Sequence, residues 1–282
     1  MTHPIVVAVS EGDEARDAVA LGVAAARLLG APLVLAGVAI AVAPAGAAVV
    51  PGWSPATDPR RLREYVAGEL RRQADAVPGD VPCTIQVAEA AGVLPGLEIV
   101  AEREQAQLVV IGASHLGPLA RAVRGDLGLG AARRVGCSVL VAPADDGMGP
   151  EVALRRIGVA WDGGPEAGAA LDLGATLAER GEAQLTVLRA AEHGEQATAR
   201  EELDAVCAQL AERVPCRAAL LMGPAAGALV AASADLDLLV IGARHRALPG
   251  SLWTGSVSTP VLRHARCPVL VVPHGARVPA PA

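Results

Sequence analysis

An internal duplication limits what this chain can fold into more than any other feature of its sequence. One stretch reads LVVIGASHLGPLARAVRGDLGLGAARRVGCSVLVAP, and a later one reads LLVIGARHRALPGSLWTGSVSTPVLRHARCPVLVVP. The matching pairs, which lie 130 residues apart, are Gly112 with Gly242, His115 with His245, Gly125 with Gly255 and Cys137 with Cys267. The starts of the halves, IVVAVSEGDEA and IGVAWDGGPEA, also match. A period this long predicts a duplicated domain instead of an array of short repeats.

Short apolar runs alternate with helical patterns in each half. The expected strands include Ile5–Val9, Leu33–Val38 and Leu108–Ile111 in the first half, and Ile157–Trp161, Gln184–Leu188 and Leu238–Ile241 in the second. The segments SVLVAP and PVLVVP close the two units. Nearly all-apolar strands that alternate with helices indicate a parallel sheet covered on both faces. The sequence therefore predicts an α/β fold.

A few residues predict where helices begin and end. Gly30 and Gly181 stand where a helix needs a left-handed residue after its last turn. Asp58 is suited to cap the next helix of the first half, and Pro59 fits the first turn of that helix.

Composition and charge narrow the possible partners. The net charge of −6 and the 1% aromatic content argue against a nucleic-acid surface, which needs basic groups and stacking faces.

Residues 28–53 carry no charge, but their prolines and glycines favour a buried strand followed by an apolar loop over a membrane span. We expect no signal peptide, and a cytoplasmic protein. The five cysteines lack metal-ligand spacing, so we interpret them as buried, reduced thiols.

The ends of the strands are where such sheets bind ligands. Asp162 follows the first strand of the second half and precedes two glycines, whereas the first half has Ser10 there. A carboxylate at this place either accepts hydrogen bonds from a ribose or a base, or caps the next helix. The spacing does not choose between these two interpretations.

The loop after the fourth strand is a second candidate. In the second half Gly242 leaves the strand, and Gly255 with Ser256 is expected to open the next helix. The N–H groups at a helix start attract anions, and hydroxyl and basic side chains nearby would add to this. The alternative is a plain helix cap, because serine before an apolar run is a common start signal.

Together these segments resemble the universal stress protein family. The resemblance rests on Asp-Gly after the first strand, on the VIG and GSVS segments and on the closing CPVLVVP, and it covers nearly the whole chain as two copies, 1–146 and 152–275. It implies two tandem five-stranded parallel-sheet domains of the adenine-nucleotide alpha-hydrolase-like type. It also implies that the domains pack as an internal pseudo-dimer through their last strands.

One branch of that family binds ATP through a G-2x-G-9x-G-[ST] loop and an aspartate after the first strand. By resemblance, Asp162, Gly242, Gly255 and Ser256 match this pattern, while His245 replaces the middle glycine. His245 there either obstructs phosphate or donates to it. The expected nucleotide site of the second half comprises Ala160, Asp162, Gly163, Ala190, Gly242, His245, Gly255, Ser256, Val257 and Ser258.

The first half departs further from the same pattern. Gly112 and Gly125 match, but His115 replaces the middle glycine and Asp126 replaces the final hydroxyl residue. Because the carboxylate of Asp126 would repel phosphate at a helix start, we expect this half to bind no nucleoside triphosphate.

The expected function is a stress-response or regulatory one, with ATP, accompanied by Mg²⁺, or another adenine nucleotide bound in the second half. No residue set indicates a catalytic cycle or a metal site. The alternative is an interaction or scaffold protein in which both sites are degenerate, with a protein partner or a homodimer as its target. A nucleotide-metabolising enzyme ranks below both.

Overall fold

The computed structural model describes residues 2–9, 14–40, 59–112, 130–131, 134–143, 152–192, 194–243, 257–273 and 275. The elements of the first half are β1 (Ile5–Ala8), α1 (Glu14–Leu29), β2 (Leu33–Ile40), α2 (Pro59–Ala74), β3 (Cys83–Ala90), α3 (Val93–Arg103), β4 (Leu108–Ile111) and β5 (Ser138–Val141). Those of the second half are β6 (Arg156–Ala160), α5 (Pro165–Arg180), β7 (Gln184–Ala191), α6 (Gln196–Leu210), β8 (Cys216–Met222), α7 (Ala225–Ala232), η2 (Ser233–Asp235), β9 (Leu238–Ala243), α8 (Ser258–His264) and β10 (Val269–Pro273).

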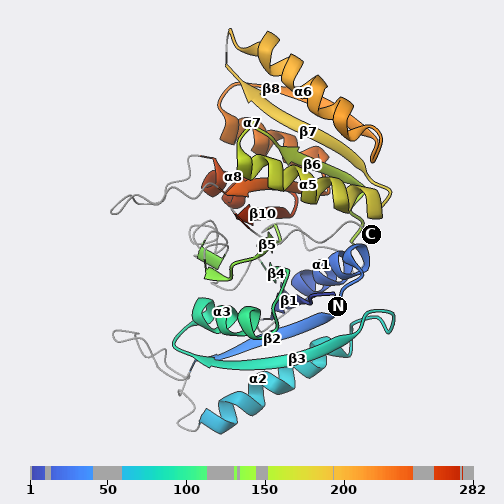
Figure 1. The fold of residues 1–282 in the computed structure, drawn as a ribbon. Helices are drawn as coiled ribbons and strands as arrows, with labels where there is room; N and C mark the ends of the chain where they lie inside the picture. Colours follow the sequence, from blue (N-terminus) through green and yellow to red (C-terminus); the bar gives the residue numbers. More distant parts are fainter. Residues whose placement is uncertain are drawn as a thin grey trace.

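The strands form one ten-stranded sheet in the order β3-β2-β1-β4-β5-β10-β9-β6-β7-β8 (Figure 1). All pairs within a half are parallel, while β5 and β10 pair antiparallel where the halves meet. Leu140 faces Leu270, its own counterpart in the repeat, so a local twofold axis passes through this pair. The expected α/β class and the packing through the last strands are both confirmed.

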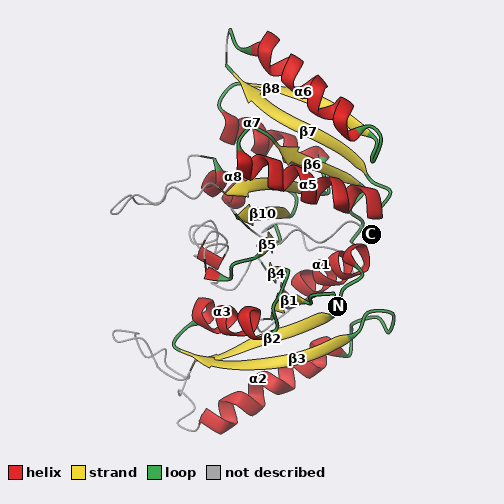
Figure 2. Ribbon diagram, viewed as in Figure 1, coloured by secondary structure: helices red, strands yellow, loops and turns green. Residues whose placement is uncertain are grey.

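Helices cover both faces of the sheet (Figure 2). One buried cluster joins side chains of α1, α2, α5 and α6 to one face, and the other joins α3, α7 and α8 to the opposite face. Because strand side chains alternate between faces, neighbouring strand residues such as Val6 and Val7 belong to different clusters. α1 and α5 meet across the junction of the halves, where the Arg180 guanidinium donates to the Leu29 carbonyl at 3.1 Å.

The helix-end predictions had mixed results. Helix α2 begins at Pro59 as expected, while Asp58 lies outside the described residues. Gly30 has the predicted left-handed backbone, with φ of 58°. The prediction was wrong for Gly181, whose φ is −90°, and the left-handed residue is Glu182 with φ of 48°. A Cβ on Gly181 would lie 2.9 Å from a Leu28 methyl, so the glycine here serves the packing of the halves.

The uncharged segment 28–53 contains the end of α1 and the buried strand β2, as predicted, and residues 41–53 lie outside the described part of the chain. No helix within the described ranges is both long and apolar enough to cross a membrane.

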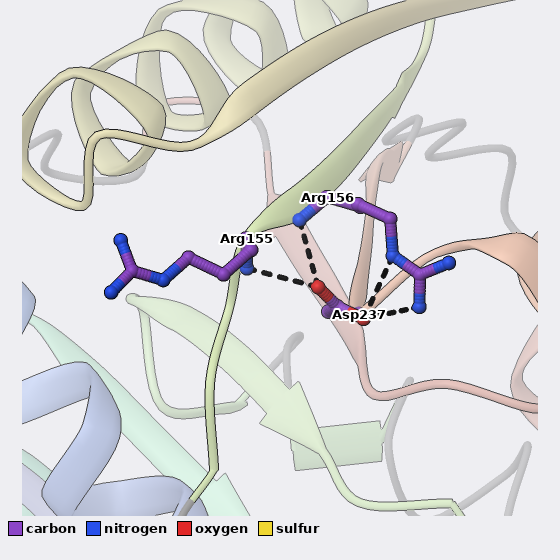
Figure 3. A network of polar contacts seen from close by, with 3 residues as sticks. All are labelled: Arg155, Arg156 and Asp237. Atoms are coloured by element: carbon purple, nitrogen blue, oxygen red, sulfur yellow. Dashed lines mark hydrogen bonds and ion pairs between the residues drawn. The ribbon is translucent and has the colours of Figure 1, made fainter.

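A polar cluster joins the amino ends of β6 and β9 (Figure 3). The Asp237 carboxylate accepts the backbone N–H groups of Arg155 at 3.0 Å and Arg156 at 2.8 Å, and the Arg156 guanidinium at 2.7 Å. In the first half Gln107 occupies the matching position, and its amide donates to the His3 carbonyl. Both halves therefore fasten the start of their first strand to the residue that precedes their fourth.

We expect Asp237→Asn to lower stability at neutral pH. Burial alone would raise the pKa of Asp237, but hydrogen bonds from Arg156 and Arg155 and the charge of Arg156 hold it below the ordinary value. A lowered pKa in the folded state contributes stability above the unfolded pKa of about 3.9, and this contribution is lost as the pH falls through the folded pKa.

The measurement is the thermal midpoint of wild type and Asp237→Asn between neutral and acidic pH. Their difference should be largest near neutrality and should shrink once the wild-type carboxylate is protonated. The control is Asp204→Asn, which removes an ion pair whose two side chains are both 56% exposed, and it should shift the midpoint little. A difference between wild type and Asp237→Asn that is independent of pH would contradict the assignment.

Candidate functional site

The candidate site lies where the strand order changes direction in the second half. Strand β6 pairs with β7 on one side and with β9 on the other. The chain runs from β6 to β7 and then to β8 at the edge, before it returns to β9 on the other side of β6. In parallel sheets, such a switch point leaves a crevice at the carboxyl ends of the two strands, and ligands bind there.

Asp162 lies at this switch point, two residues after the end of β6. Its Oδ1 accepts the backbone N–H of Gly164 at 2.9 Å, and Gly163 between them has φ of 79°. The N-cap residue of α5 is Gly164, which has no side chain to cap the helix. Asp162 therefore folds the turn between β6 and α5 by binding the N–H of the residue just before the helix. The binding of a ribose or base by the same carboxylate stays a prediction.

Gly242, in β9, lies against the first turn of α5. A Cβ at this position would lie 2.6 Å from the carbonyl oxygen of Glu166 and 3.0 Å from the N atom of Ala167. Only glycine allows the first turn of α5 to approach β9 this closely. The structure thus brings Gly242 beside the start of α5, and this close packing requires a glycine whether or not a nucleotide binds.

The structure describes only some of the other predicted site residues. Ala160 ends β6 and Ala190 lies in β7, and both side chains are half-buried. Helix α8 begins at Ser258 after Val257, two residues later than the predicted start at Ser256. The predicted residues of either half that lie outside the described residues are Ser10, His115, Gly125, Asp126, His245, Gly255 and Ser256.

Three side chains near the end of β6 contact one another, and the sequence did not predict these contacts. The Arg189 guanidinium lies over the Trp161 ring, 5.3 Å from its centroid, and also forms an ion pair with Glu202 on α6. Trp161 follows β6 directly, and its backbone N–H donates to the carbonyl of Leu188 at 2.8 Å. Arg189 was the residue from which these contacts could have been predicted, because a charge inside an otherwise apolar strand needs a partner.

The first half is built differently at the equivalent place. By strand register, Val9 and Gly37 stand where the second half has Trp161 and Arg189. A cavity of about 210 Å³ lies there, and its lining residues are Ala8, Val9, Ala36, Val38, Tyr65, Val66, Glu69, Leu70, Val93 and Leu97. The two halves thus share the same strand arrangement but differ in the side chains at the carboxyl ends of their first two strands.

Glu69 is the acidic residue of this cavity. It forms an ion pair with Arg72 and accepts a hydrogen bond from the Gln73 amide at 3.3 Å. The hydrogen bond from Arg72 outweighs burial and lowers the pKa of the Glu69 carboxyl. Glu69 is therefore ionised at neutral pH and already held by its own helix.

Comparison with known proteins points to one family. The model of the universal stress protein family matches residues 1–143 and again residues 153–273. A universal stress protein of Mycobacterium tuberculosis is 30% identical over 224 residues, which are 74% of this chain and 76% of the relative.

Solved structures agree on the fold. The crystal structure of a universal stress protein from Archaeoglobus fulgidus superposes with a TM-score of 0.73 at 15% identity, and covers 98% of this chain and 100% of its own. A putative universal stress protein from Pseudomonas aeruginosa has a TM-score of 0.65 at 17% identity, and covers 96% of this chain and 93% of its own.

We predict that Gly242→Ala destabilises the fold even without any ligand. The added methyl would overlap the Glu166 carbonyl, and forced shifts of this kind cost about 1–3 kcal/mol. The matched control is Gly227→Ala on α7, where a Cβ meets nothing within 4 Å, and it should stabilise by up to about 1 kcal/mol. Urea unfolding of both variants measures the two effects. An unchanged stability of Gly242→Ala would show that packing does not require this glycine.

Proposed function

Because the chain belongs to the universal stress protein family, we propose that it is a stress-response protein that binds ATP or another adenine nucleotide through its second half. The observation that carries the proposal is the turn from Asp162 to Gly164 at the switch point between β6 and β9. This is the place where a doubly wound sheet binds a nucleotide.

The residues of the turn suit a ribose. A carboxylate at a strand end accepts hydrogen bonds from ribose hydroxyls, and Asp162 is the residue that matches the aspartate of ATP-binding family members. A Cβ added to Gly163 would have the Trp161 ring as its nearest neighbour, at 3.9 Å. The backbone at Gly163 is thus open enough for a ligand to approach closely.

The phosphates would extend toward the start of α8. We assign their binding to Gly255, Ser256 and Ser258, with His245 as a further donor in place of the missing glycine. Mg²⁺ bound to ATP would neutralise phosphate charge in this site. Asp126 makes the first half the poorer site, since its carboxylate replaces the hydroxyl at the equivalent position.

A second candidate function is that of an interaction protein that binds no nucleotide. It is favoured by the fact that both described motif residues have structural roles. Gly242 is required by the approach of α5, and Asp162 folds its own turn. In this case the ten-stranded frame would serve as a docking or dimerisation surface.

Calorimetric titration of ATP into the intact protein, with and without Mg²⁺, separates the two candidates. We expect Asp162→Ala to weaken binding about tenfold or more, because a hydrogen bond to a charged group contributes about 1.5–3 kcal/mol. Asp162→Asn keeps an oxygen that can accept from the Gly164 N–H, so it tests whether an effect comes from the turn or from the charge.

The matched control is Ser10→Ala, which alters the equivalent position of the first half and should leave the affinity unchanged. Absence of heat at millimolar ATP would exclude nucleotide binding. Loss of binding in Ser10→Ala but not in Asp162→Ala would move the site to the first half.

A further inference from the structure

Two cysteines of the second half lie in direct contact. Cys207 is in the last turn of α6 and Cys216 is the first residue of β8. The Cys216 thiol donates a hydrogen bond to Sγ of Cys207, with the two sulfur atoms 2.7 Å apart. A disulfide bond has a length of about 2.05 Å, so only a small side-chain movement separates this contact from a covalent one.

The elements that carry the sulfurs are held in place around them. The turn that joins α6 to β8 is closed by hydrogen bonds from the N–H groups of Arg213 and Val214 to the Leu210 carbonyl. The Pro215 carbonyl, just before Cys216, accepts the N–H of Leu185 on β7 at 3.0 Å. The proximity of the sulfurs is therefore a property of the packed fold.

Both residues of the pair are also less buried than two of the other cysteines. Cys207 and Cys216 are half-buried, whereas Cys137 and Cys267 are buried. Strand β8 stands at the end of the strand order, so the pair is at an edge of the sheet. This differs from the sequence-based prediction that the cysteines are uniformly buried.

The repeat supplies an internal comparison. Cys83 begins β3 in the first half and is the counterpart of Cys216 by strand register. The position that corresponds to Cys207 is Ala74, the last residue of α2. The contact of the thiol with the next carbonyl is common to both halves, Cys83 to Thr84 at 3.8 Å and Cys216 to Arg217 at 3.9 Å. Only the second half therefore has a second cysteine, Cys207, at this place.

We propose that Cys207 and Cys216 form a reversible disulfide, which makes the end of α6 and the start of β8 a thiol-oxidation site. With hydrogen peroxide as the oxidant, one of the two sulfurs attacks one oxygen, the O–O bond breaks, and a sulfenic acid and one water form. The other sulfur then attacks the oxidised sulfur, the S–S bond forms, and a second water leaves. Two thiols lose two protons and two electrons, and the peroxide accepts them.

Burial and the hydrogen bond with Cys207 raise the pKa of Cys216 to about 12, so its thiol is protonated at neutral pH and reacts slowly there.

The test treats the full chain with hydrogen peroxide, removes the oxidant and counts free thiols after unfolding with a mass-tagged maleimide. Wild type should lose two of its five thiols and recover both with dithiothreitol. Peptide mapping should find Cys207 joined to Cys216. The variants Cys207→Ala and Cys216→Ala should form no intramolecular disulfide, and the control Cys83→Ala should behave as wild type.

A second readout needs no oxidant. Phenylarsine oxide binds two neighbouring thiols at once, so it should protect two thiols of folded wild type and of Cys83→Ala, and none of Cys207→Ala. Five unchanged thiols after peroxide would overturn the proposal, as would a disulfide mapped to another pair or formed between chains.

Discussion

The antiparallel pairing of β5 with β10 is the contact on which the rest of the architecture depends. Without it both strands would be sheet edges that expose Val139, Leu140 and Val141 or their counterparts, and apolar edges of this kind pair with other chains. With it, both strands are paired on each side and the two halves share one sheet. The contact of α1 with α5 then closes the junction on one face.

This frame positions the candidate site through one close backbone approach and two carboxylates that accept backbone N–H groups. Gly242 allows α5 to lie against β9, and the hydrogen bond from Gly164 to Asp162 sets how the chain enters α5. At the other end of the same strands, Asp237 holds the start of β6. The chain is therefore held by these contacts at both ends of β6.

The strands were predictable because buried parallel strands are nearly uniform apolar runs. The prediction for β7 stopped at Leu188, although the strand continues to Ala191, because Arg189 interrupts the run. The fold accommodates this charge through Glu202 and the Trp161 ring, which come from other elements. Pairing of this kind depends on tertiary packing, and the local sequence does not show it.

The candidate site was predictable only in part for the same reason. The sequence places Asp162 at a strand end, but it does not tell which N–H the carboxylate accepts. It also shows Cys207 and Cys216 nine positions apart without indicating that the end of a helix and the start of a strand bring their sulfurs together. Spacing identifies the residue types, and the packing of α6 on β7 and β8 decides the contacts.

The pairing of Leu140 with its own counterpart Leu270 has a consequence for how the two halves can differ. An interface with this symmetry is of the kind that joins two identical subunits, where each substitution appears at two places at once. In a single fused chain, a substitution appears once. Cys207 has Ala74 as its counterpart in the repeat, and Arg189 has Gly37. A dimer of identical chains could not have such differences between its two subunits. Covalent fusion thus permits a symmetric scaffold to hold two unlike sets of side chains.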